Sequence, residues 1–154
     1  MTISPMDGRQ LRWVEPILRD CGEVFKEEEV AMATQMAHAA VLRSEYSILA
    51  AVEGRRLLGF CIAGQVPLTE STWCLYWLVV HPEFQRRGVA AALHSALERA
   101  MRAAGGQRIV CETSVRDSYA PARAFYQSAA YVEYGRVADY YSPGDSCVFF
   151  CKVI

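Results

Sequence analysis

The stretch of sequence that decides the fold is residues 73–91, which read WCLYWLVVHPEFQRRGVAA. Its first eight residues are apolar at every position, a pattern typical of a central strand that is buried on both faces. Pro82 breaks that strand, and a short loop leads into the Ala- and Leu-rich segment from Val89 to Ala104. This segment predicts a helix, because strong helix formers dominate it and Gly105-Gly106 follows it.

The loop between this strand and this helix is suited to bind an anion. The first turn of a helix has unpaired N–H groups and the positive end of the helix dipole, which together favour a phosphate. Gly88 allows the backbone to approach such a group closely, and the small Ala90 and Ala91 leave the helix start uncrowded. The loop contains neither the G-x-G-x-x-G nor the G-x-x-x-x-G-K motif. From the residues alone, an ordinary turn is the alternative.

The rest of the chain predicts further strands and helices on both sides of this unit. Two short apolar runs, Ser47–Glu53 and Leu57–Ala63, flank Gly54-Arg55-Arg56 and indicate a β-hairpin. The remaining elements that we predict are helices over Asp7–Cys21, Lys26–Leu42 and Ala120–Ser128, and strands over Arg108–Ser114, Tyr131–Tyr140 and Cys147–Val153. A strand, a helix and a strand in direct succession imply a parallel crossover. The expected fold class is therefore α+β, a three-layer α/β arrangement in which about four helices flank a mixed central β-sheet of about six to seven strands.

Composition limits the classes of function that are open to the chain. Its 154 residues fit a single domain, which we take to be residues 1–154. The formal net charge of −1 argues against a general nucleic-acid binder, which needs a surplus of Lys and Arg. No apolar segment approaches the roughly 20 residues that cross a membrane, so we expect no membrane partner.

The six cysteines are expected to be reduced thiols. No pair has the C-x-x-C spacing and the His residues are scattered, so we expect no metal site. Several cysteines lie in apolar runs, such as Phe60-Cys61-Ile62, where a free Cys packs as a small hydrophobic side chain. The first residues show no secretory signal. These observations predict a cytoplasmic protein.

Two motifs, one in the loop and one in a later helix, carry a resemblance to a known family. Gln85-x-x-Gly88-x-Ala90, after an apolar strand, is similar to the motif Q/R-x-x-G-x-G/A. Residues 119–126, YAPARAFY, are similar to the motif N-x-x-A-x-x-F-Y. Both motifs belong to the GNAT superfamily of acyl-CoA-dependent N-acetyltransferases, and the order of elements from residue 47 onward resembles it too. In this order and at this spacing the two motifs are jointly specific.

The resemblance implies a binding site for acetyl-CoA. The residues that would hold the pyrophosphate of coenzyme A, mainly through main-chain N–H groups, are Gln85, Arg86, Arg87, Gly88, Val89, Ala90 and Ala91. The Arg86 and Arg87 side chains either reach the phosphates or are solvated surface cations. The resemblance also implies that main-chain groups of Leu78, Val79 and Val80 align the pantetheine arm, and that the Val80 amide polarises the thioester carbonyl. Tyr119 stands where the family often has an Asn that contacts the cofactor.

The resemblance further implies which side chains handle protons. Tyr126 matches the family's general acid at the cofactor, and a phenol can protonate the departing thiolate when it is correctly positioned. The alternative for Tyr126 is a ring packed on the sheet with its hydroxyl group in solvent. For the general base the candidates are Glu112, within a strand, and Glu70, in the loop before the central strand. An ion pair between Glu112 and an Arg such as Arg116 is an equally good interpretation.

The function that these features predict is transfer of an acetyl group from acetyl-CoA to a primary amine of a small molecule or peptide. The amine would attack directly within a ternary complex, because no Cys lies in the loop or beside a His. The alternative is a non-catalytic acyl-CoA-binding or regulatory module. Tyr140-Tyr141 would line the rim of an acceptor pocket, and we expect a structural role for His81. The last strand, Cys147–Val153, is either core or the edge of a homodimer.

Overall fold

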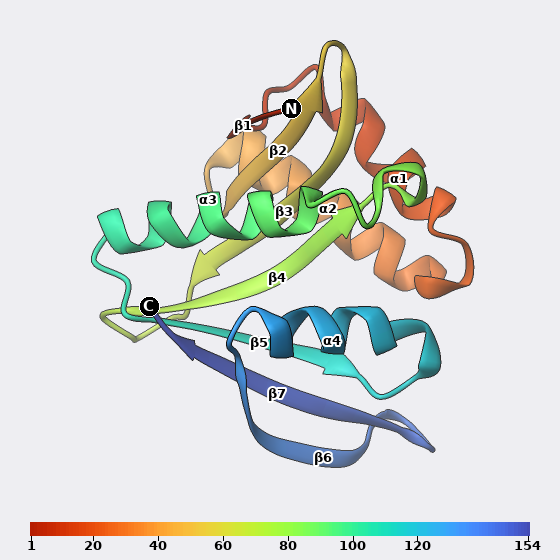
Figure 1. The fold of residues 1–154 in the computed structure, drawn as a ribbon, viewed down its shortest axis with the longest axis vertical. Helices are drawn as coiled ribbons and strands as arrows, with labels where there is room; N and C mark the ends of the chain where they lie inside the picture. The colour runs from red at the N-terminus through yellow and green to blue at the C-terminus, as the bar shows by residue number, and fades with distance from the viewer.

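The computed structural model describes all 154 residues and contains seven strands and four α-helices (Figure 1). The strands are β1 (Thr2–Pro5), β2 (Ser47–Glu53), β3 (Arg56–Gln65), β4 (Thr72–Val80), β5 (Arg108–Ser114), β6 (Val132–Ser142) and β7 (Asp145–Val153). The helices are α1 (Val14–Asp20), α2 (Glu27–Arg43), α3 (Val89–Ala103) and α4 (Ala120–Ser128). Short 3-10 turns span Leu11–Trp13, Gly22–Val24, Pro82–Phe84 and Asp117–Tyr119.

All seven strands belong to one sheet, in the order β1-β2-β3-β4-β5-β7-β6. Every neighbouring pair is antiparallel except β4 and β5, which are parallel because α3 connects them as a crossover. Helices α3 and α4 lie on one face of the sheet, and α1 and α2 lie behind the other (Figure 1). This arrangement confirms the expected three-layer fold with a mixed central sheet.

Two hydrophobic cores, one on each face, hold these layers together. Under α3 and α4, the core includes Val89, Leu93, Leu97 and Met101 of α3, spaced four residues apart on one side of the helix. Under α1 and α2, the core includes small residues of α2 that allow this helix to lie close to the sheet, namely Ala33, Ala37 and Ala40. The central strands β3 and β4 contribute to both cores, as their continuous apolar sequences predict.

The parallel pair β4 and β5 is joined over only a short distance. Thr72, Trp73 and Cys74 pair with Arg108, Ile109 and Val110, and no later residues of the two strands pair. Figure 1 shows β4 and β5 moving apart from this point toward their carboxyl ends. The sheet is therefore split in its middle, between β4 and β5.

Three local features differ from the sequence-based expectation. Strand β1 was not expected, because a four-residue segment that contains Pro5 has little strand signal; it pairs with β2 at the sheet edge. The first helix is shorter than Asp7–Cys21, since its first turn is 3-10 and α1 begins only at Val14. Pro16 is accommodated because it lies in the first turn of α1, where an N–H has no intrahelical partner. None of the helices is long and apolar enough to cross a bilayer.

Gly59 sets how closely β3 approaches β4 at the place where β4 ends. A Cβ atom at this position would stand 2.5 Å from the carbonyl oxygen of Val79. We expect Gly59→Ala to lower the free energy of unfolding by about 1–3 kcal/mol, because overpacking against a backbone atom forces the strands apart. Gly8→Ala is the matched control, since nothing lies within 4 Å of a Cβ atom there. Equal changes in urea unfolding for the two variants would contradict this assignment.

Candidate active site

The free edge of β4 at the split offers main-chain groups to a ligand, and the register determines which ones. The His81 amide donates to the Leu58 carbonyl at 2.9 Å, so the two residues form a hydrogen-bonded pair. Main-chain groups alternate in direction along a strand. The N–H and C=O groups of Leu78 and Val80 therefore point away from β3, toward the split, whereas those of Val79 point toward β3. Of the three residues expected to align the pantetheine arm, Leu78 and Val80 have main-chain groups in position to do so.

The loop after β4 forms a backbone cradle in front of α3. Arg86 has φ +61° and Gly88 has φ +79°, two left-handed residues separated by one. Such backbone directs successive N–H groups into one concavity that suits an anion, and α3 starts directly afterwards at Val89. A Cβ atom on Gly88 would meet no atom within 4 Å, so the space at this position is open. The positive φ of Arg86 is a strained conformation for a residue other than Gly, as is common at functional sites.

The core and the end of β4 anchor this loop. Phe84 is 6% exposed and lies between two guanidinium groups, with Arg56 at 4.8 Å and Arg87 at 5.5 Å from the ring centroid. The Gln85 side-chain amide donates to the Val80 carbonyl at 3.1 Å. The Gln of the motif therefore fixes the end of β4 relative to the loop, a role for its side chain that the sequence alone does not reveal.

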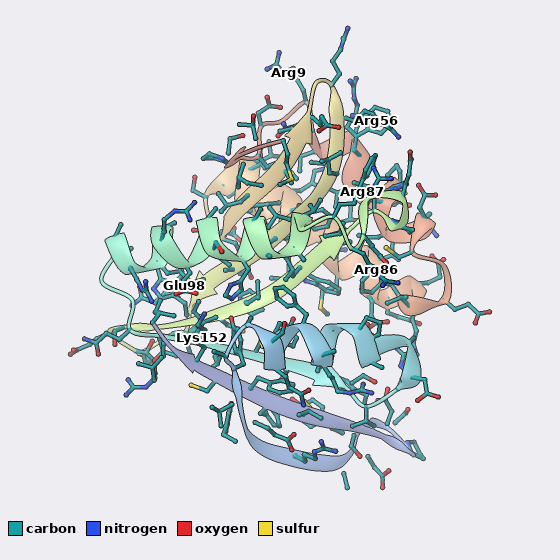
Figure 2. All side chains as sticks on the ribbon, in the orientation of Figure 1. Arg9, Arg56, Arg86, Arg87, Glu98 and Lys152 are labelled. Carbon is teal, nitrogen blue, oxygen red and sulfur yellow. The ribbon has the colours of Figure 1, made fainter.

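The loop also presents two cations that have no counter-ion within the protein. Neither Arg86 nor Arg87 forms an ion pair, whereas Arg56 pairs with Glu83 at 2.8 Å. Figure 2 shows Arg86 and Arg87 beside the amino-terminal end of α3. The main-chain cradle, the helix terminus and these two side chains together fit a diphosphate.

Tyr126 lies on the α4 side of the sheet, next to the start of the split. Its ring packs between Tyr131 and Phe150, with centroid distances of 5.4 and 5.5 Å. Burial, together with the neighbouring Cys111, raises the pKa of the Tyr126 hydroxyl well above its usual value. Cys111 is the first residue of β5 beyond the last pair with β4. The hydroxyl is thus protonated at neutral pH and buried near the split, not in solvent.

Glu112 lies on the opposite face of β5. Its pairing partner is Phe149, whereas the preceding residue, Cys111, pairs with Phe150 in the core under α3 and α4. Burial by its neighbours raises the pKa of the Glu112 carboxyl. Glu112 forms no ion pair; its one hydrogen-bonding partner is the Cys147 thiol, with Sγ at 4.0 Å from Oε2. The ion pair with Arg116 that the sequence left open is therefore absent.

Tyr126 and Glu112 thus lie near the first residues of β5 past its last pair with β4, on opposite faces of the sheet. The phenol is on the side of α3 and α4, and the carboxylate is on the side that these helices leave open. The two faces of β5 thus carry a phenol, which can donate a proton, and a carboxylate, which can accept one. This is the arrangement that a transfer reaction with an acid and a base requires.

Tyr119, which stands where a cofactor contact was expected, instead has a partner within the protein. Its hydroxyl donates to Glu29 Oε1 at 2.6 Å, and its ring lies 6.2 Å from that of Phe25. Arg116 links the same Glu29, at 3.5 Å, to Asp145, at 3.4 Å. These contacts tie the start of α2 to the end of β5 and to the start of β7. The sequence does not reveal that Glu29 and Asp145 are the partners of these side chains, because Glu29 and Asp145 are far from them along the chain.

The two remaining candidate residues, His81 and Glu70, are not placed for a role in catalysis at the split. His81 Nδ1 accepts from the Glu83 amide at 3.2 Å and Nε2 lies 3.2 Å from Asp20 Oδ2, so both ring nitrogens are engaged, as expected for a structural role. Glu70 lies in the loop before β4, at the end of the strand remote from Val80. Of the two candidate bases, only Glu112 lies at the split.

Comparisons with known proteins agree with this geometry. The sequence profile of the acetyltransferase (GNAT) family matches residues 10–131. A search of curated protein sequences finds no significant match. A solved structure described as a GNAT-family acetyltransferase from Desulfovibrio desulfuricans has a TM-score of 0.93 and 26% sequence identity, and the alignment covers 99% of this chain and 98% of that one.

Two more distant structures share the fold. An aminoglycoside 6'-N-acetyltransferase solved with coenzyme A aligns with a TM-score of 0.79 and 20% identity, over 99% of this chain and 97% of that one. The ribosomal-protein-S18-alanine N-acetyltransferase from Escherichia coli also aligns with a TM-score of 0.79 and 20% sequence identity, and the alignment covers 99% of this chain and 93% of that one. The chain belongs to the GNAT family of acetyltransferases.

The loop assignment predicts a specific effect of Gly88→Ala. We expect the free energy of unfolding to fall by about 1 kcal/mol, because Ala is strained at positive φ, and the Kd for coenzyme A to rise about tenfold or more, which corresponds to about 1.4 kcal/mol. Gly105→Ala is the matched control: Gly105 has φ +83° and open space around its Cβ position, but it lies at the other end of α3. Calorimetric titration with coenzyme A distinguishes the two variants. Equal Kd values for both would refute the phosphate-loop assignment.

Proposed function

We propose that this protein transfers the acetyl group of acetyl-CoA to the primary amine of a small molecule or peptide by direct attack in a ternary complex. The observation that carries the proposal is the placement of Tyr126 and Glu112 on opposite faces of the sheet at the start of the split. Acetyl-CoA supplies a thioester that an unprotonated amine can attack.

On the donor side, main-chain groups do most of the binding. The N–H groups of residues 86–91 and the Arg86 and Arg87 side chains would hold the pyrophosphate, at the positive end of the α3 dipole. The main-chain groups of Leu78 and the Val80 N–H would pair with the pantetheine arm as an added strand does, while the Val80 carbonyl is held by Gln85. The Val80 N–H then points into the split, where it stabilises negative charge that develops on the carbonyl oxygen; one such donor is worth about 3–4 kcal/mol in other acyl transfers.

The side chains on the two faces would move the protons. The Glu112 carboxylate accepts a proton from the acceptor ammonium, which frees the nitrogen lone pair to form the C–N bond. As the C–S bond breaks, Tyr126 donates its proton to the departing sulfur, and the proton that the nitrogen loses as the amide forms restores the phenol. Burial keeps the Tyr126 hydroxyl protonated at neutral pH, so its O–H is available to the sulfur at that moment.

A covalent route through a cysteine has less support. Burial raises the pKa of Cys21 to about 11 and the pKa values of Cys61 and Cys74 to about 12, so these residues are thiols at neutral pH. A thiol is a poor nucleophile compared with its thiolate. All six cysteines are free, which is also consistent with the reducing cytoplasm as the site of action.

The acceptor is an amine in the distant structural relatives, whose names include aminoglycosides and the alanine of a ribosomal protein. Glu112 fits such a group, since a carboxylate without an ion-pair partner attracts an ammonium. A non-catalytic acyl-CoA-binding module would need the loop and the split but neither Tyr126 nor Glu112 in these positions.

Tyr126→Phe should preserve coenzyme A binding and lower kcat. The ring packing with Phe150 and Tyr131 is retained, and only the proton donor is removed. We expect a fall in kcat of about 10- to 1000-fold, with an unchanged Kd for coenzyme A. Thiol release, measured with an amine acceptor across the pH range, provides the test. A kcat equal to that of the wild type at every pH would reduce Tyr126 to a packing role.

Glu112→Gln should have opposite effects on activity and on stability. At pH 7 we expect kcat/KM to fall by about 100- to 10,000-fold and to recover as the pH approaches the pKa of the free amine, because solvent then replaces the base. The folded-state pKa of Glu112 lies above the ordinary carboxyl value, so the charged form opposes folding at neutral pH, and this penalty disappears as the pH falls below the unfolded-state pKa.

Because Glu112→Gln removes this charge, the variant should have a higher free energy of unfolding than the wild type at pH 7, as measured by urea unfolding. Glu70→Gln is the matched control for activity, since Glu70 precedes β4 at the end remote from Val80. An active Glu112→Gln variant, or an inactive Glu70→Gln variant, would move the base from Glu112 to another group.

A further inference from the structure

Around Glu112, the open face of the sheet consists of aromatic rings. The rings of Tyr134 and Tyr140 each lie 5.8 Å from that of Phe149, and those of Tyr140 and Tyr141 lie 5.0 Å apart. Phe149 pairs directly with Glu112 across β5 and β7, so their side chains are on the same face. We call these four residues, Tyr134, Tyr140, Tyr141 and Phe149, the aromatic face.

The aromatic face is open to a ligand. Tyr134, Tyr140 and Tyr141 are 59%, 49% and 44% exposed, which is unusual for three neighbouring aromatic residues. No helix covers this side of β5, β7 and β6 (Figure 1). The register of β6 shifts twice along β7, between Glu133 and Gly135 and again between Val137 and Ser142, and these irregular segments contain all three tyrosines. The irregular strand thereby places several aromatic side chains on one side of the sheet.

Two carboxylates around this face form no ion pair: Glu112, and Asp139, which precedes Tyr140 in β6 and whose Oδ1 accepts from the Gly144 amide at 2.7 Å. Glu112 has no ion-pair partner, and its Oε2 accepts only from the Cys147 thiol, which itself accepts from the Tyr141 hydroxyl at 3.5 Å. Just beyond the carboxyl end of β5, Arg116 is shared between Glu29 and Asp145. A ligand at Glu112 therefore meets a carboxylate without a counter-ion, beside aromatic rings.

From this arrangement we infer the class of acceptor: a small primary amine that carries one ammonium group and an aromatic body, such as an arylalkylamine. The inference rests on the proposed function, because it assigns the amine to Glu112. The ammonium would lie at the carboxylate, with the tyrosine rings beside it, and the aromatic body would stack on Phe149, Tyr134 and Tyr140.

Two other kinds of acceptor fit this face less well. Polyamines and aminoglycosides carry several ammonium groups, and each group that leaves water needs a carboxylate or another acceptor; Glu112 can serve only one. A peptide carries backbone amides that need hydrogen-bonding partners. The main chain of β7 is already paired with β5 on one side and β6 on the other, so a peptide lying across β7 beside Glu112 meets side chains alone.

The test compares four acceptors with the wild-type protein and acetyl-CoA: 2-phenylethylamine, n-butylamine, spermidine, and the peptide Phe-Gly-Gly. We expect kcat/KM for 2-phenylethylamine to exceed that of each of the others by about tenfold or more. Thiol release gives the rate, and mass spectrometry gives the acetylated product. A higher kcat/KM for spermidine or for the peptide would overturn the inference and leave the proposed function intact.

Variants of the aromatic face provide the second part of the test. Tyr134→Leu and Tyr140→Leu should each raise KM for 2-phenylethylamine about fivefold or more at nearly constant kcat, because a ring that binds the body of the substrate contributes equally to the ground state and the transition state. KM for n-butylamine should remain unchanged. Trp13→Leu is the matched control, since Trp13 is an aromatic residue of similar exposure, 44%, on the 3-10 turn before α1.

The outcomes separate the two claims. Equal increases in KM for both amines, or an effect of Trp13→Leu as large as that of Tyr140→Leu, would overturn the assignment of the aromatic face. Binding of coenzyme A without acetylation of any of the four acceptors would overturn the proposed function and, with it, the inference.

Discussion

The early separation of β4 and β5 is the constraint on which the rest of the site depends. The two strands are joined over only three residue pairs, beginning at Thr72 and Arg108. Beyond them, the main-chain groups of Leu78 and the Val80 N–H require a partner, and water or an extended ligand can provide it, whereas the Val80 carbonyl already accepts from Gln85. The split is stable because the core under α3 and α4 contains residues of both halves, and because Tyr119 and Arg116 tie the half containing β5 to Glu29 on α2.

The proposed cofactor is strongly anionic, whereas the protein has a net charge of −1. The attraction is local: it comes from the start of α3, the left-handed residues Arg86 and Gly88, and two guanidinium groups without counter-ions. The opposite face of the split has the reverse character, with the carboxylate of Glu112 among aromatic rings. In the proposed reaction, this difference in charge would direct the donor and the acceptor to different sides of the sheet.

Much of this could be predicted from the sequence, because the informative signals are local. The loop from Gln85 to Ala91 and the helix after it follow from consecutive residues, and the order of strands and helices follows from their periodicity. Long-range contacts were not predictable. The partner of Tyr119 is Glu29, 90 residues earlier in the chain, and Arg116 pairs with Glu29 and Asp145 and not with Glu112. Strand β1 also went unpredicted, since its pairing with β2 and not its own composition makes it a strand.

The central claim is that coenzyme A completes the sheet at the split by pairing with the free edge of β4. Residue-resolved amide hydrogen exchange, with and without coenzyme A, tests it most directly. The Leu78 and Val80 amides should become strongly protected on binding, together with those of the loop before α3, while the Val79 amide, already directed toward β3, should change little. Protection of the loop alone, with unchanged exchange at Leu78 and Val80, would contradict the account.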